Sequence, residues 1–169
     1  KGKTCEYRGI AVQCGPRGLP GEGDFLFRNE GDLRFTEVGE AAGVSDPRGY
    51  FGLGVAWFDH DDDGWPDLYV ANDSRPSLLY TNQRNGTFAN TALLSGAAMT
   101  DEGKAEASMG VDAGDFANDG DEDLFMTELT GEGANLYVND VTATGEDRSM
   151  STGLGVATLS YTGFGTAWV

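Results

Sequence analysis

The chain has 169 residues, 39% of them hydrophobic and 23% charged, so it is long enough to bury a core and is neither collagen-like nor disordered by composition. Its 11 Lys and Arg residues against 28 Asp and Glu residues give a net charge of −17, which argues against nucleic acid or an anionic membrane surface as a partner and favours a cationic one. No run approaches the ~20 apolar residues of a membrane span, and no apolar signal-peptide core opens the chain, so any export signal is expected to have been removed already.

The opening residues 1–23 are predicted to form a disulfide-linked N-terminal arm. Both cysteines, Cys5 and Cys14, lie in the Gly- and Pro-rich stretch "CEYRGIAVQCGPRGLPG", which shows little sign of helix. Two cysteines so close together in a loop-rich segment favour a short-range disulfide and an extracellular protein. Two reduced thiols in a cytosolic protein are the alternative.

Residues 24–169 are predicted to be all-β. In "GVAWF", "DLYVAN" and "SLLYTN", residues favoured in strands are bounded by Gly and by Asp-rich turns, and Asn85-Gly86 predicts a hairpin into a fourth strand, "TFANT". The 26 glycines and the absence of a long 3.6-residue period argue against helices. Four antiparallel strands per ~50 residues are typical of a β-propeller blade.

The blades follow one another along the chain and differ in completeness. They are a part-blade at 24–38, whole blades at about 52–91 and 109–144, and the first strand of a further blade at 163–169. These are too few to close a ring of ~4–8 blades. The chain is therefore expected to be a segment of a larger propeller, or to have its ring completed by other chains.

An internal repeat supports this division. The stretch "FGLGVAWFDHDDDGWPDLYVA" aligns without a gap on "ASMGVDAGDFANDGDEDLFMT", with a period of 56 residues, the distance from Gly54 to Gly110. A second landmark recurs with it as "LFRN", "LYTN" and "LYVN", and "GFGTAWV" at the end of the chain matches "GLGVAWF". Repetition in register indicates successive copies of one structural unit.

Each whole blade contains an acidic loop between its first two strands. In "DHDDDGWPD" the pattern D-x-D-x-D-G-x-x-D puts side-chain oxygens at loop positions 1, 3, 5 and 9, while Gly64 permits the turn that points them inward. Oxygen ligands in a flexible loop favour calcium over magnesium, which requires strict octahedral geometry. Position 12 is Val70 rather than the Glu of an EF-hand, which excludes that motif.

The alternative is a solvated acidic hairpin without a metal, but this would not require the same positions to recur in the second loop, "DFANDGDED". There Ala117 replaces the acid at position 3, and three side-chain acids are left, with water or Asn118 as the candidate replacement. The first loop is therefore expected to bind calcium more tightly than the second.

The two units, each followed by the "LYxN" landmark, resemble FG-GAP/VCBS-type repeats, the integrin-α-like β-propeller blades whose interstrand loops bind calcium. The opening "CEYRGIAVQCGPRGLPGEGDFLFRNEGDLRFTEVGEAAGV" further resembles the secreted cartilage-acidic-protein-like family. The resemblance implies calcium ligands in both blades. In the first they are Asp59, Asp61, Asp63, the carbonyl of Trp65, and Asp67; in the second they are Asp115, Asp119, the carbonyl of Asp121, and Asp123.

Other residues carry weaker signals. His60 is the only histidine, and its side chain is expected to point away from the ion; no Ser or Cys has a recognisable base partner, so catalysis is not expected. The aromatic residues recur at repeat positions and are expected to pack the blades. Asn72 and Asn85 match the N-glycosylation pattern, which is short enough to arise by chance.

Two functions of different classes follow from this interpretation. The first is a non-enzymatic, extracellular calcium-binding propeller module for cell adhesion, protein–protein interaction or self-assembly. The second is a carbohydrate-binding or scaffold propeller attached to an extracellular enzyme. The expected partners are calcium and other protein chains or copies of the same chain, with glycans as a further class. A propeller supports many functions, so the fold alone identifies no partner.

Overall fold

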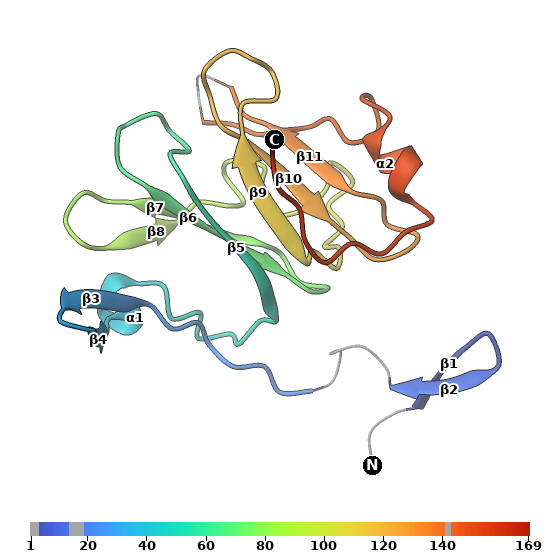
Figure 1. Ribbon diagram of the computed structural model, residues 1–169, viewed down its shortest axis with the longest axis horizontal. Coiled ribbons are helices and arrows are strands. Elements are labelled where there is room, and N and C mark those ends of the chain that lie inside the picture. The colour runs from blue at the N-terminus through green and yellow to red at the C-terminus, as the bar shows by residue number, and fades with distance from the viewer. Residues whose placement is uncertain (1–3, 14–18, 141–142) are drawn as a thin grey trace.

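The structure is a computed structural model, and it describes residues 4–13, 19–140 and 143–169. In the described part, two four-stranded antiparallel sheets and two two-stranded hairpins account for the strands, and only two short helices accompany them (Figure 1). No helix among these residues is long and apolar enough to cross a membrane. The prediction of an all-β chain with four-stranded antiparallel blades is confirmed.

The N-terminal hairpin consists of β1 (Thr4–Tyr7) and β2 (Ile10–Gln13), and Figure 1 shows it apart from the other sheets. Arg8 and Gly9 join the strands with φ of 50° and 79°, the positive values that a two-residue hairpin turn requires. The structure describes Cys5 but not Cys14, so the pairing of the two cysteines lies outside the described residues and stays a prediction.

Reduction of the intact protein is expected to open one disulfide between Cys5 and Cys14. The loop between them is short, so the bond should add about 2–3 kcal/mol of stability, confined to the N-terminal arm. Intact-mass measurement before and after reduction checks this, with the mass gain of one reduced disulfide as the expected result. Two thiols that react with an alkylating agent before reduction would contradict the pairing.

The first four-stranded sheet lies in the stretch predicted to be a whole blade, and it is called the first blade from here on. Its strands lie in the order β5-β6-β7-β8. They are β5 (Gly52–Phe58), β6 (Asp67–Asn72), β7 (Leu78–Asn82) and β8 (Phe88–Asn90). β7 pairs with β8 across the predicted Asn85-Gly86 turn, where Gly86 has a φ of 87°. The repeated strand pattern and the turn residues therefore produce the expected blade.

The second sheet repeats this arrangement with the order β12-β11-β10-β9. Its strands are β9 (Gly110–Gly114), β10 (Asp123–Thr127), β11 (Asn135–Val138) and β12 (Glu146–Asp147). β12 lies just beyond the boundary expected near Thr144. The division of the chain into an arm, part-blades and whole blades stays a prediction.

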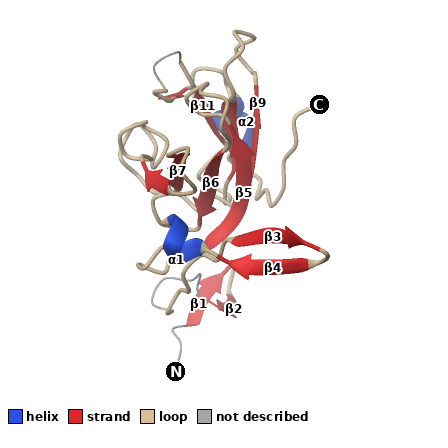
Figure 2. Ribbon diagram, turned by 90° about the vertical axis from the view of Figure 1, so that its left-hand side faces the viewer, coloured by secondary structure: helices blue, strands red, loops and turns tan. Residues whose placement is uncertain are grey.

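The remaining elements flank the two blades. β3 (Phe27–Gly31) pairs with β4 (Arg34–Glu37), and Figure 2 shows this hairpin next to the short helix α1 (Gly39–Ala42) and below β5. The helix α2 (Leu154–Thr158) follows the second blade. No strand is assigned to residues 163–169, so a first strand of a further blade there stays a prediction.

Strand β6 supplies alternate side chains to two cores, because successive residues of a strand point to opposite faces. Tyr69 and Ala71 face the second blade and pack in a cluster with Phe58, Leu79, Leu124, Met126 and Tyr137. Leu68 and Val70 face the other way, in a cluster with Ala42, Val44, Leu78 and Tyr80. The blades thus pack sheet against sheet, as in a propeller.

The inner strands of neighbouring units approach closely at repeated glycines. A Cβ atom at Gly54 would lie 2.6 Å from the carbonyl oxygen of Met109, and one at Gly110 would lie 2.9 Å from the Cα of Gly165. Both distances are too short for a side chain, so these positions require glycine. β9 lies beside β5, and the chain near Gly165 lies beside β9. This packing brings the acidic loops of the two blades together.

Candidate metal centre

The first acidic loop, residues 59–66, connects β5 to β6. Asp62 and Gly64 have φ of 51° and 82°, and this left-handed backbone reverses the chain. The Asp59 carboxylate then accepts hydrogen bonds from the amides of Asp63, at 3.0 Å, and Gly64, at 2.8 Å. Aspartate at the loop start therefore stabilises the turn by itself, before any ion is considered.

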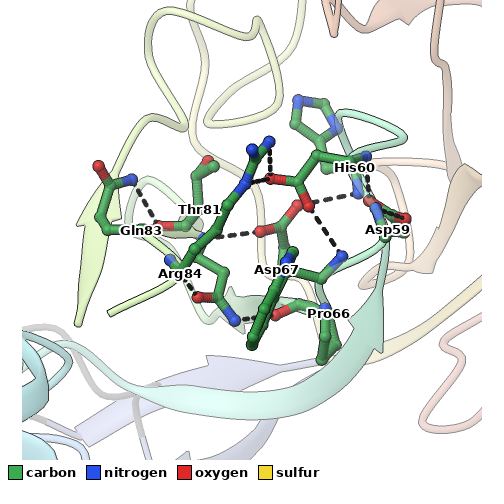
Figure 3. A network of polar contacts seen from close by, with 11 residues as sticks. Asp59, His60, Pro66, Asp67, Thr81, Gln83 and Arg84 are labelled. Carbon is green, nitrogen blue, oxygen red and sulfur yellow. Dashed lines mark hydrogen bonds and ion pairs between the residues drawn. The ribbon is translucent and has the colours of Figure 1, made fainter. Parts of the chain in front are cut away.

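Asp67 is the most buried acid of the loop. It is the first residue of β6, it is only 1% exposed, and it accepts hydrogen bonds from the amides of His60, at 2.9 Å, and Asn82, at 2.7 Å (Figure 3). The pKa of Asp67 is raised to about 6, mainly by burial. The two hydrogen bonds lower this pKa, and the charges of Asp61 and Asp63 raise it further. A cation beside this carboxylate would offset the desolvation that raises the pKa.

Two acids of the first loop converge with the first residue of β6. Asp59, Asp61 and Asp67 each offer a carboxylate oxygen within 4.8 Å of the others. The pKa of Asp61 is raised, first by desolvation and then by the charges of Asp63 and Asp59. Each carboxylate keeps lone pairs that its hydrogen bonds do not use. This all-oxygen donor set fits a hard divalent cation such as calcium.

The fourth acid, Asp63, lies outside this group of three. Its carboxylate accepts a hydrogen bond from Arg84 Nε at 2.6 Å and another from the amide of Trp65 at 2.8 Å (Figure 3). Arg84 lies in the β7–β8 turn of the same blade, so the blade supplies its own positive charge to this carboxylate. Direct ligation by Asp63 and by the Trp65 carbonyl stays a prediction.

The second acidic loop, residues 115–122, repeats the backbone of the first. The Asp115 carboxylate accepts hydrogen bonds from the amides of Asp119, at 3.0 Å, and Gly120, at 3.1 Å. Asp123 is 0% exposed and accepts hydrogen bonds from the amides of Phe116, at 2.7 Å, and Asn139, at 2.8 Å. The repeated acids therefore have the same structural role in both blades, which is to accept main-chain hydrogen bonds that hold the turn.

The two loops differ in how the acids meet. Over the described ranges, the acids of the second loop include no three whose oxygens converge as those of Asp59, Asp61 and Asp67 do. Ala117 stands where the first loop has Asp61, so the middle oxygen is missing. Asp119 accepts a hydrogen bond from the amide of Asp121 at 3.1 Å. The predicted ligation by Asp115, Asp119, Asp123 and the Asp121 carbonyl stays a prediction.

His60 has a structural role, a contact with the second blade, that its position in the loop did not indicate. It is 5% exposed, and its Nε2–H donates to the carbonyl of Ala143 at 3.1 Å. Burial lowers the pKa of His60 below its usual value, although the bond to Ala143 and the charges of Asp61 and Asp59 oppose this, so the imidazole is neutral at neutral pH. The ring therefore links the first loop to the second blade.

Sequence reasoning also missed the asparagines that hold the buried acids. Asn82 and Asn139 end the "LYTN" and "LYVN" landmarks, and their amides donate to Asp67 and Asp123, respectively. The recurrence of asparagine in this landmark was the available signal. A residue repeated in register with an acidic loop is expected to contact that loop, because each blade folds the same way.

Comparison with known proteins agrees with the repeat. Residues 59–126 match the FG-GAP-like repeat family, a stretch that begins at Asp59 and includes both acidic loops. Over 57 residues the chain is 42% identical to cartilage acidic protein 1 of Homo sapiens and 40% identical to that of Mus musculus. The aligned stretch covers 34% of this chain but only 8% of the human and 9% of the mouse protein, so the chain matches less than a tenth of the length of these relatives. Residues 59–126 are therefore similar to FG-GAP-like repeats, and they include the acidic loops that connect the first two strands of both four-stranded sheets.

Proposed function

We propose that this chain is a non-enzymatic, calcium-binding propeller segment that works outside the cell in adhesion, protein–protein contact or self-assembly. The observation that carries the calcium site is the convergence of Asp59, Asp61 and Asp67. Like charges held this close repel one another, and a bound cation turns the repulsion into attraction. Calcium suits the site because it accepts a flexible oxygen shell of 6–8 ligands, which water can complete.

The interaction part of the proposal rests on the repeat and on the charge. An acidic loop connects the first two strands of each four-stranded sheet, and a net charge of −17 favours cationic partner surfaces. The extracellular location rests on the predicted Cys5–Cys14 pair and on the similarity to cartilage acidic protein 1, which covers a third of the chain. Calcium in the millimolar range outside cells would keep even a weak loop site filled.

Calorimetric titration of the full chain with calcium is expected to show two classes of site, the tighter one in the first loop. Asp61→Asn should remove the tighter class, because it takes away one of three converging carboxylates, while Asp119→Asn should remove the weaker class. Affinity follows the number of charged ligands and the rigidity of the site.

Asp62→Asn is the matched control for Asp61→Asn. It makes the same charge change in the same loop at an exposed residue outside the converging group, and asparagine tolerates the φ of 51° found there. Its titration should stay much closer to that of the wild type than the titration of Asp61→Asn does, because only the long-range attraction of one charge is lost. The calcium site would be contradicted if the wild type gave no binding heat, or if Asp61→Asn bound as tightly as Asp62→Asn.

A further inference from the structure

The first two residues of the first acidic loop are held by the second blade. The amide of Asp59 donates to Glu122 Oε2 at 2.8 Å, and the carbonyl of His60 accepts from Asn139 Nδ2 at 2.7 Å. Glu122 ends the second acidic loop, and Asn139 follows β11. Both contacts go from a side chain to the main chain, so they fix where the loop starts rather than how its side chains point.

These contacts form part of a continuous hydrogen-bonded chain between the buried acids of the two blades. His60 donates its amide to Asp67, and Asn139 donates its amide to Asp123, so the His60–Asn139 contact joins the two acids. Asn139 is 6% exposed, so its side chain has little contact with solvent. A shift of the second blade would therefore move the main chain from which Asp59 projects.

The asparagine that ends the repeated landmark makes different contacts in the two blades. Asn82, which matches Asn139, gives its Nδ2 to the carbonyl of Pro66 within its own blade, at 3.0 Å. The contact of Asn139 with His60 therefore joins the two blades, whereas the contact of Asn82 stays within one blade.

We propose that Glu122 and Asn139 are positioning residues for the first acidic loop, so that cation binding there is coupled to the packing of the second blade on the first. The inference rests on the calcium site proposed above. Residues that orient ligands from outside the coordination shell commonly change metal affinity by about 10–100-fold when they are removed. Such coupling is reciprocal, so the bound ion must also stabilise the junction between the blades.

Glu122 could also affect cation binding at the first loop through its charge alone. A pocket of ≈ 200 Å³ lies between the two loops, and its lining includes Asp59, Asp61, Asp62, Asp121 and Glu122. A carboxylate beside such a pocket attracts a cation without positioning anything. Glu122→Gln separates the two explanations, because glutamine keeps an oxygen that accepts the Asp59 amide but carries no charge.

The test titrates calcium into the full chain in an Asp119→Asn background, so that the heat reports the first loop. Glu122→Ala is expected to weaken binding at least about tenfold, and Glu122→Gln to restore most of the loss. Glu40→Ala, an exposed charge on α1, is the charge-matched control and should bind as the background does. Equal affinity of Glu122→Ala and the control would overturn the inference, as would a Glu122→Gln variant as weak as Glu122→Ala.

Hydrogen exchange gives a second measurement of the coupling. If the contacts of Glu122 and Asn139 were purely structural, calcium would not change amide exchange across the junction. In the wild type, calcium should slow exchange of the amides of Asp59 and Asn139, which lie on either side of the junction. Glu122→Ala should reduce this protection, while its unfolding midpoint in a chelator stays near that of the wild type. If the wild type binds calcium but the Asn139 amide exchanges at an unchanged rate, the inference fails and the proposed function stands. If the wild type binds no calcium, both fail.

Discussion

Transfer of the protein from millimolar calcium to a chelator is expected to lower the midpoint of thermal unfolding by roughly 5–10 °C. A ligand at a hundredfold excess over its Kd adds about 2.7 kcal/mol to the folded state. For a chain of this size each kcal/mol corresponds to about 2–4 °C. The physical cause is the repulsion among Asp59, Asp61 and Asp67, which a bound cation relieves.

Asp61→Asn is expected to remove most of this difference. The variant loses one converging carboxylate, so calcium stabilises it less; in the chelator it should unfold at or slightly above the wild-type midpoint, because one repulsive charge is gone. Asp62→Asn should keep most of the calcium effect. Differential scanning calorimetry of the three proteins in both buffers is the measurement. An identical wild-type midpoint in calcium and in chelator would show that the acidic loops are only solvated hairpins.

A large dependence of stability on pH is expected from Glu128, a buried acid that immediately follows β10. It is 3% exposed; its Oε1 accepts hydrogen bonds from Ser108 Oγ at 2.8 Å and Asn135 Nδ2 at 3.4 Å, and its Oε2 has no partner. The pKa of Glu128 is raised to about 8, mainly by burial. The hydrogen bond from Ser108 and the charge of Lys104 lower this pKa, whereas the charges of Glu106 and Glu132 raise it. The side chain is therefore protonated in the folded protein at neutral pH.

The sign of the pH dependence follows from this raised pKa. In the unfolded chain Glu128 ionises near its usual value of 4.5, whereas in the folded state it holds its proton up to about 8. Its contribution to stability is complete below the unfolded pKa and is lost as pH rises through the folded pKa. Each pH unit in that window costs about 1.4 kcal/mol at full effect. The unfolding midpoint should fall by on the order of 10 °C from pH 5 to pH 8 because of this group.

Glu128→Gln isolates the contribution, since it replaces the protonated acid with a neutral group of the same shape. The variant's midpoint should fall much less between pH 5 and pH 8, and at pH 8 it should unfold above the wild type. Glu102→Gln, at an exposed glutamate, is the matched control and should follow the wild-type profile. All melts are made in chelator, so that calcium binding does not titrate with them. Parallel profiles for wild type and Glu128→Gln would refute the buried, protonated acid.

Much of the fold and of the loop chemistry could be predicted from the sequence, because both are encoded locally. Alternating strand residues bounded by Gly and Asp specify short strands, and Asn85-Gly86 specifies the hairpin between β7 and β8. Aspartates at loop positions 1 and 9 recur because each accepts a main-chain hydrogen bond from its own loop, as Asp59 does from Asp63 and Asp67 does from His60. Such contacts span a few residues and leave a readable spacing.

The tertiary structure decided which acids face one another and which have other partners. Arg84 takes the carboxylate of Asp63, a contact that depends on how the β7–β8 turn lies over the first loop. His60 meets Ala143 and Asn139 only because the second blade packs against the first. In the sequence Glu128 cannot be distinguished from the other acids of a strongly acidic chain. Its burial in the folded protein raises its pKa and keeps it protonated at neutral pH. Contacts between residues so far apart in sequence depend on sheet packing and side-chain direction, which no local spacing records.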